Sequence, residues 1–183
     1  MIGEAFGGVL ARAQAGDEAA FAGIFRDVQP ALLRYLRVIT PDAEDVAGET
    51  WLQVAAGLTA FRGEEEAFRA WLFTIARHRA ADAGRSRARR PTAPLALAET
   101  PDQPVAPDAA DLALEAISAR AAVALIATLP RDQAEIIMLR VVAGLDATDV
   151  ARIVGKSPGA VRVAAHRGLR RLADLVERAG VTH

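Results

Sequence analysis

The chain has 183 residues, a formal net charge of -1 and 52% hydrophobic residues, which is enough for one ordinary domain or two small ones with a packed core. It contains no cysteine, so a disulfide framework and a cysteine-based metal site are excluded. The three histidines, at positions 78, 166 and 183, lie far apart, and no segment is apolar over eighteen residues. We expect a soluble, cytoplasmic protein with no metal, no cofactor and no insertion into a membrane.

The first 90 residues show helical periodicity almost throughout. Asp17 can cap a first helix, Pro30 is expected to start or kink the next segment, and Thr-Pro-Asp at 40–42 breaks the chain. A further helix follows, with Trp51 and Leu52 among its apolar residues. Residues 60–68 predict a loop, and a long helix then runs into an arginine cluster.

Charge alternates along the chain, although the total is close to zero. Residues 77–90 hold six arginines and one acid, a net +5, and residues 152–178 hold seven bases and two acids, again +5. Residues 92–115 hold five acids and no base, a net -5, and five of the nine prolines fall between 91 and 107. This composition disfavours a packed core. It predicts a flexible, acidic, proline-rich linker over 91–110 that joins helical domains at 1–90 and 111–183. The predicted fold is therefore all-α.

Residues 146–158 carry the signals of two helices joined by a tight turn. Asp146 is a candidate N-cap of the first helix, and Gly155 stands where that helix must end in a left-handed turn. Ser157 can cap the second helix, with Pro158 at its first position, where a missing N–H costs nothing. The pattern predicts a helix-turn-helix.

The second helix of this motif has two distinct faces at 100° per residue. One face is apolar and is expected to be its core stripe: Val161, Ala165, Gly168, Leu169, Leu172, Leu175 and Val176. The opposite face holds Gly159, Arg162, Val163, His166, Arg167, Arg170 and Arg171. An α-helix fits the DNA major groove, where arginine can contact guanine edges or phosphates. We therefore expect DNA binding rather than a merely solvated face.

Aromatic residues beside the first arginine cluster suit single-stranded nucleic acid, because bases stack on rings while arginine follows the phosphates. Most of these rings can equally belong to the core: Trp51, Phe68, Trp71 and Phe73. Phe61, in the loop with Gly63, is the best candidate for an exposed ring. His78 suits helix packing and base contact equally well.

The sequence resembles a known family in two motifs that occur in a fixed order. The first is "DAEDVAGETWLQV" followed by "FRAWLFTIARHRAAD", and the second, after the linker, is "LPRDQAEIIMLRVVAGLDATDVARIVGKSPGAVRVAAHRGLRRL". The segment "FAGIFRDVQPALLRYL" (21–36) also matches the family's opening helices. The chain is similar, over about 10–175, to the extracytoplasmic-function (ECF) group of bacterial RNA polymerase sigma factors.

The resemblance implies two helical domains without catalysis of their own, and two partners, the polymerase core and promoter DNA. Sigma region 2 would dock on the clamp helices of the largest subunit and melt the minus-ten element. Region 4 would sit on the flap of the other large subunit and bind the minus-thirty-five element. The implied docking face is Asp45, Val46, Glu49, Thr50 and Trp51. The implied minus-ten residues are Phe61, Arg62, Arg77, His78, Arg79 and Asp82, with 61–68 as the loop that takes a flipped base. The implied minus-thirty-five residues are Ser157, Gly159, Arg162, Val163, His166, Arg167 and Arg170.

Three departures from the family pattern bear on these expectations. Gly48 stands where the family usually has glutamine, and His78 where it has asparagine; residues 64–66 are three glutamates that would repel phosphate. The resemblance leaves open an anti-sigma partner and the arrangement of the two domains.

Three other classes of protein compete with this resemblance. A helix-turn-helix regulator that binds a palindrome as a dimer is the main alternative. An adaptor is disfavoured by the turn chemistry at 155–158, and an enzyme by the lack of clustered histidines or a phosphate-binding loop.

Overall fold

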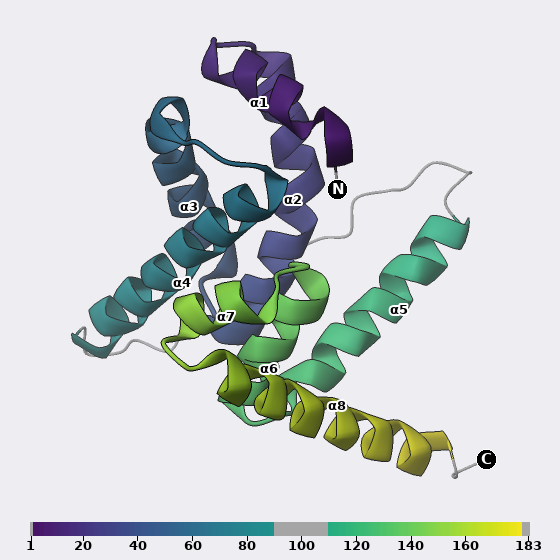
Figure 1. The fold of residues 1–183 in the computed structure, drawn as a ribbon. Helices are drawn as coiled ribbons and strands as arrows, with labels where there is room; N and C mark the ends of the chain where they lie inside the picture. Colours follow the sequence, from purple (N-terminus) through teal and green to yellow (C-terminus); the bar gives the residue numbers. More distant parts are fainter. Residues whose placement is uncertain (1, 90–109, 181–183) are drawn as a thin grey trace.

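A computed structural model describes residues 2–89 and 110–180, with side chains described for 2–89 and 119–178 (Figure 1). Within these ranges the chain is built from helices and short connections and contains no β-strand, which confirms the all-α prediction. Of the predicted linker, 91–109 lies outside the described residues, and Ala110 is already helical.

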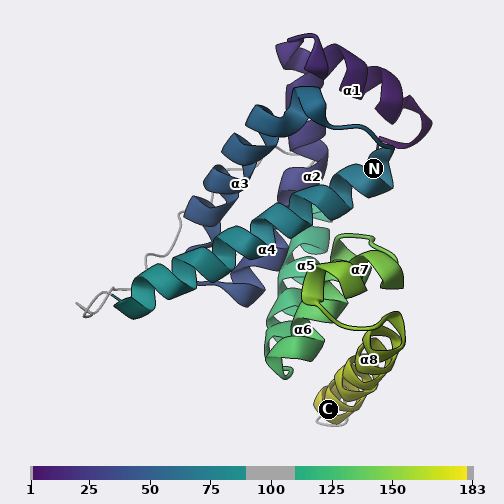
Figure 2. The ribbon, with the colours of Figure 1, turned by 60° about the vertical axis from the view of Figure 1, so that its left-hand side comes forward.

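The N-terminal domain is a set of four α-helices. They are α1 (Phe6–Gln14), α2 (Glu18–Ile39), α3 (Ala43–Gly57) and α4 (Glu65–Arg89), with 3-10 turns at Gly3–Ala5 and Leu58–Ala60. Helices α3 and α4 pack against each other and α2 packs on both, while α1 lies against α2 (Figure 2). The break between α2 and α3 falls at 40–42, as the sequence predicts.

Helix α2 begins at its predicted cap, because the Asp17 carboxylate accepts a hydrogen bond from the Ala20 N–H at 3.0 Å. The prediction that Pro30 starts a new segment is wrong, since α2 is one continuous helix through it. Buried Val28, Ala31 and Leu32 flank the proline and anchor the helix on both sides. This packing offsets the one backbone hydrogen bond that a proline removes.

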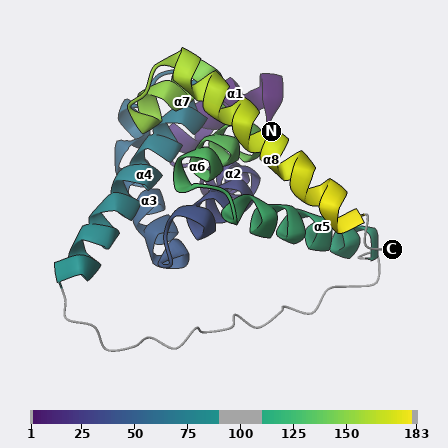
Figure 3. The same ribbon diagram turned by 90° about the horizontal axis from the view of Figure 1, so that it is seen from below.

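The C-terminal domain consists of α5 (Ala110–Ala127), α6 (Arg131–Ile137), a π-helical turn η4 (Met138–Val142), α7 (Ala147–Val154) and α8 (Pro158–Gly180). Helices α7 and α8 form the predicted helix-turn-helix, and α8 packs against both α6 and α7. The C-terminal half of α8 extends beyond these neighbours (Figure 3).

The turn of this motif has the predicted chemistry. Gly155 adopts a left-handed conformation, with φ 69°, and ends α7. The Asp146 carboxylate accepts from the Asp149 N–H at 2.7 Å, and the Ser157 hydroxyl accepts from the Ala160 N–H at 3.2 Å. Each helix of the pair therefore begins at a side-chain cap, which satisfies one of its otherwise unpaired N–H groups.

The two domains pack together, which answers the question of arrangement that the sequence leaves open. Helix α2 contacts α5, α6 and η4, and α4 contacts α7. The buried side chains of both domains belong to one continuous hydrophobic cluster. We call this packing the closed arrangement.

Candidate nucleic-acid and polymerase interfaces

The predicted DNA-binding face of α8 and its turn is exposed along its whole length. All seven predicted residues lie at the surface: Ser157, Gly159, Arg162, Val163, His166, Arg167 and Arg170. Among the described residues, no salt bridge engages the guanidinium groups of Arg162, Arg167 or Arg170. The face therefore offers three cations to an anionic partner.

The opposite face of α8 fixes the helix on the rest of the domain. Val161 is fully buried, and Gly168 lies so close to α6 that a Cβ there would stand 2.5 Å from the Ile137 Cδ1 atom. The Arg171 side chain adds a hydrogen bond to Gln133 at 3.2 Å. The predicted core stripe is wrong at two positions, because Leu169 and Val176 are exposed.

In the predicted base-flipping loop, the Phe61 ring packs against other aromatic rings of the same domain. Phe61 is only half-buried, but its ring stacks on Trp71, with centroids 5.0 Å apart, and meets Phe68 edge-on. The Phe61 carbonyl accepts hydrogen bonds from both Gln14 and Arg62. The expectation of a freely exposed Phe61 ring is therefore wrong for this arrangement, although Arg62 itself is exposed.

The predicted minus-ten residues on α4 differ in whether their side chains are already bound to other residues of the protein. His78 is exposed, whereas the Arg79 guanidinium donates two hydrogen bonds to the Gln53 side chain of α3, at 2.7 and 2.9 Å. Asp82 pairs with Arg85 on the same helix. Arg77 donates from Nε to the Glu135 carboxylate at 2.7 Å. The structure thus brings Arg77 against the other domain.

Helix α3 does not present the docking face that the resemblance implies. Val46, Thr50 and Trp51 are buried, and the Trp51 indole N–H donates to Gln29 at 2.6 Å, so these three side chains are not offered to a docking partner in this arrangement. Asp45 and Glu49 are exposed.

The exposed face of α3 contains Leu52, which the sequence pattern predicts to be among the apolar residues of this helix. Leu52 is 74% exposed, although its neighbour Trp51 is buried. It stands seven residues after Asp45 and three after Glu49, the spacing of one helix face. This spacing alone would have predicted that Leu52 lies beside the two acids on the exposed face. We define Asp45, Gly48, Glu49 and Leu52 as the α3 surface.

A polar network between the domains was not predicted. The Tyr35 hydroxyl of α2 donates to the same Glu135 oxygen as Arg77, at 3.2 Å. Burial, and then the negative charge of Glu135, raise the pKa of the Tyr35 hydroxyl well above its ordinary value. Nearby, Arg69 of α4 donates from Nε to the Ala143 carbonyl at 3.0 Å, just after η4. No sequence spacing could have paired residues about one hundred positions apart.

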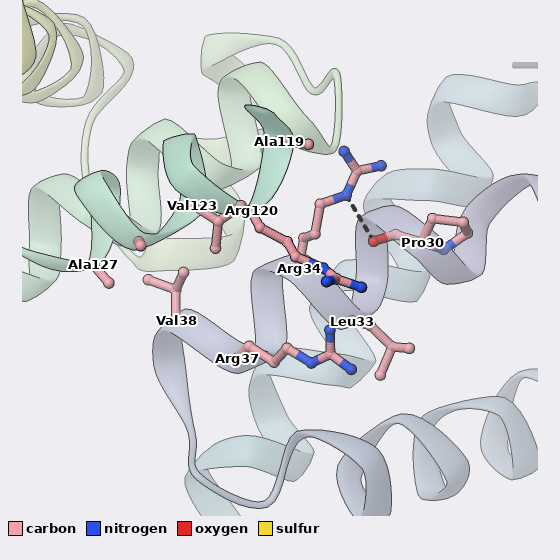
Figure 4. Close-up of a pocket in the computed structure, with 10 residues that line it drawn as sticks. Pro30, Leu33, Arg34, Arg37, Val38, Ala119, Arg120, Val123 and Ala127 are labelled. Atoms are coloured by element: carbon pink, nitrogen blue, oxygen red, sulfur yellow. Dashed lines mark hydrogen bonds between the residues drawn. The ribbon is translucent and has the colours of Figure 1, made fainter. Parts of the chain in front are cut away.

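A groove of about 670 Å³ opens between α2 and α5 (Figure 4). Its walls come from both domains, because α2 is N-terminal and α5 C-terminal. The lining mixes apolar and cationic side chains and includes no acid: Pro30, Leu33, Arg34, Arg37, Val38, Ala119, Arg120, Val123, Ala124 and Ala127.

Neither a metal site nor a membrane-spanning helix occurs among the described residues. Over 2–89 and 119–178, no three acidic or histidine side chains gather as a metal site would require. In the same part of the chain, no helix combines the length and apolar character needed to cross a bilayer.

Two family models match successive parts of the chain. The family described as Sigma-70 region 2 matches residues 24–90, and Sigma-70, region 4 matches residues 119–172. The chain is 39% identical over 189 residues to the ECF RNA polymerase sigma factor SigD of Mycobacterium tuberculosis, covering 98% of this chain and 88% of that one. It is 36% identical to ShbA of Streptomyces griseus, covering 93% and 95%.

Solved structures share the fold. The sigma factor RpoE of Bartonella quintana, crystallised with the anti-sigma factor NepR, has a TM-score of 0.61 and 25% identity over 86% of this chain and 96% of that one. CnrH, in complex with the cytosolic domain of CnrY, also has a TM-score of 0.61 at 22% identity, covering 96% and 99%. On the matched regions and the relatives together, the chain belongs to the ECF group of sigma factors, the RNA polymerase subunits that direct promoter-specific initiation of transcription.

Proposed function

We propose that the two domains divide the work of this sigma factor between two named surfaces. The exposed face of α8 (Arg162, Val163, His166, Arg167 and Arg170) reads the minus-thirty-five element in the major groove. The α3 surface (Asp45, Gly48, Glu49 and Leu52) docks on the clamp helices of the polymerase core. The observation that carries the proposal is the helix-turn-helix with three arginines that no acid of the described residues neutralises.

The chemistry of the α8 face fits duplex DNA. Arginine can donate in bidentate fashion to guanine, or hold phosphates. The apolar Val163 lies among these cations and suits contact with a thymine methyl group. Because Val161 and Gly168 anchor the helix from behind, this face can enter the groove without unpacking the domain.

The α3 surface has a mixed character that suits a protein partner. Two carboxylates share one helix face with an exposed leucine, so a basic helix could pair with the acids and cover Leu52. Val46, Thr50 and Trp51 contribute from beneath by holding α3 in place.

We propose that the minus-ten strand follows α4, contacting Arg62, Arg77, His78 and Arg79. For Phe61 to accept a flipped base between rings, its stack on Trp71 must open. Glu64 directly precedes α4, and Glu65 and Glu66 lie in its first turn; we place all three away from the phosphates.

We also propose that the protein works in the cytoplasm and that an anti-sigma protein is a further partner. The support is that RpoE, with which it shares its fold, was crystallised with an anti-sigma factor. A single inhibitor segment in the groove between α2 and α5 would touch both domains at once.

The experiment that tests the proposed function is transcription in vitro with purified core polymerase, this chain, and fragments of the host genome. Specific transcripts should arise only when both proteins are present. Transcription should then be lost with Arg162→Ala on α8 but retained with Arg152→Ala on α7, which removes one exposed cation outside the recognition helix. Equal loss from both variants would contradict the assignment of the α8 face.

A further inference from the structure

One carboxylate joins three helices across the two domains. The Glu135 Oε1 atom on α6 accepts from the Arg77 Nε atom on α4 at 2.7 Å and from the Tyr35 hydroxyl on α2 at 3.2 Å. Tyr35 is fully buried and Glu135 is only 9% exposed. We propose that Tyr35, Arg77 and Glu135, with Arg69 and the Ala143 carbonyl, form an interdomain clasp that holds the free sigma factor closed.

The clasp restricts a proposed DNA contact. Arg77 lies among the residues that we propose for the minus-ten strand, and here its guanidinium is bound to a carboxylate. A phosphate cannot use that Nε–H while Glu135 holds it. The clasp itself rests on geometry alone, but its effect on DNA binding rests on the proposed function.

Size also makes the closed arrangement unsuited to a promoter. Elements centred at minus thirty-five and minus ten are about 25 base pairs apart, or roughly 85 Å along the duplex. A compact chain of this length has a diameter of only about 40 Å. Both domains can reach their elements only after they separate, so the contacts between them must break first.

Opening of the clasp leaves no unpaired charge buried in either domain. Arg69 is 6% exposed, and its NH1 atom also donates to Asp27 at 3.2 Å and lies 3.6 Å from a Glu65 oxygen. All three residues belong to the N-terminal domain. Arg69 therefore stays paired with Asp27 and Glu65 when the domains separate and its hydrogen bond to the Ala143 carbonyl is lost. Glu135, freed with α6, becomes solvated, which avoids the large cost of an isolated buried charge.

The chain allows a direct test because it has no natural cysteine. Cysteines at the exposed positions Ala19 on α2 and Ala173 on α8 would carry a dye pair for single-molecule energy transfer on the full chain. The free protein should be mostly in a high-transfer, closed state. Glu135→Ala should lower the closed-to-open ratio by about tenfold or more, because charged hydrogen bonds are lost.

Two further variants should change the closed-to-open ratio by smaller amounts, and a third serves as a control that should not change it. Glu135→Gln keeps an acceptor for Tyr35 but loses the charge, so its closed-to-open ratio should fall between those of the wild type and Glu135→Ala. Tyr35→Phe removes only the 3.2 Å bond and should have a smaller effect. Asp132→Asn, three residues earlier, breaks an exposed pair with Lys156 inside the C-terminal domain and should leave the ratio unchanged. Circular dichroism checks that each variant keeps its helices.

Each outcome decides a different part of the proposal. A wild-type protein that is already open, or Glu135 variants that are as closed as the wild type, would overturn the clasp. If the Glu135 variants open the protein but core polymerase never lowers the energy transfer, the clasp stands and the proposed polymerase docking fails. Opening by core polymerase, and at a lower core concentration for Glu135→Ala, is the result expected when both hold.

Discussion

The Nε atom of Arg77 lies 2.7 Å from the Oε1 atom of Glu135, although 58 residues separate them in the sequence. The pair connects α4 of region 2 to α6 of region 4, and Tyr35 of α2 donates to the same oxygen. A residue of the predicted promoter-binding helix thus serves the interface between domains in this structure. We propose that the Arg77 Nε–H either bonds to Glu135 in the closed protein or contacts a phosphate of the minus-ten strand, and it cannot do both at once.

Tyr35 gives a spectroscopic signal for the closed arrangement, because it is the single tyrosine of the chain. Burial and the Glu135 charge raise its pKa, while Arg77 and Arg131 act in the opposite direction more weakly. We expect phenolate absorbance to appear only well above the ordinary tyrosine range of about 10. In Glu135→Ala the open fraction should titrate in the ordinary range. An ordinary titration of the wild type would contradict a buried Tyr35.

The same shift has a consequence for stability at high pH. The folded protein holds the tyrosine proton more tightly than the unfolded chain does, so Tyr35 contributes stability that is fully present below the unfolded pKa. The contribution is lost as pH rises from about 10 through the raised folded value. Chemical denaturation across this window should show a falling free energy of unfolding, and Tyr35→Phe should remove that part of the slope.

A change at Arg162 should separate DNA recognition from polymerase binding. Arg162→Ala is expected to weaken binding of the holoenzyme to promoter DNA by about tenfold, within the 1–3 kcal/mol range of a bidentate base contact. Affinity for the core should not change, because α3 is untouched. Fluorescence anisotropy with labelled duplex and with labelled core gives both values. Arg152→Ala is the matched control for loss of one positive charge.

The α3 surface makes the opposite prediction. Leu52→Ala should weaken core binding by about tenfold, because a leucine buried in a protein interface contributes roughly 1.5–3 kcal/mol. Glu49→Gln should reduce the affinity less and in a salt-dependent manner. Glu18→Gln, an exposed carboxylate on α2, serves as the control. Unchanged core affinity in both α3 variants would place the docking surface elsewhere.

Two glycines at helix positions should respond to alanine in opposite directions. Gly168→Ala puts a Cβ 2.5 Å from the Ile137 Cδ1 atom in a buried contact, so we expect a loss of about 1–2 kcal/mol in the free energy of unfolding. At Gly48 no atom lies within 4 Å, and alanine should gain up to about 1 kcal/mol through helix propensity. Urea denaturation of both variants checks the sign. Destabilisation by Gly48→Ala would contradict the open environment of α3.

Local signals predicted the helices and the turn well. The cap at Asp17, the left-handed Gly155 and the Ser157 cap all depend on residues within three or four positions, and each is present in the structure. The arginine face of α8 followed from the same short-range periodicity. These features need no knowledge of the rest of the fold.

Features that depend on tertiary packing could not be predicted from the sequence. Pro30 remains inside a helix because its buried neighbours hold it there. Leu52 and Leu169 look like core residues by type, but no element covers them. The clasp joins α2 and α4 to α6 across the intervening chain, so its pairing follows from how the domains meet and not from any spacing.

The most direct test of the account is a titration of the purified protein with bacterial core RNA polymerase, followed by binding to a promoter-like duplex with and without core. We predict tight core binding and DNA binding that appears only when core is present. Dimeric binding to a palindromic duplex by the protein alone, with no affinity for core, would contradict the account. It would support a helix-turn-helix regulator instead.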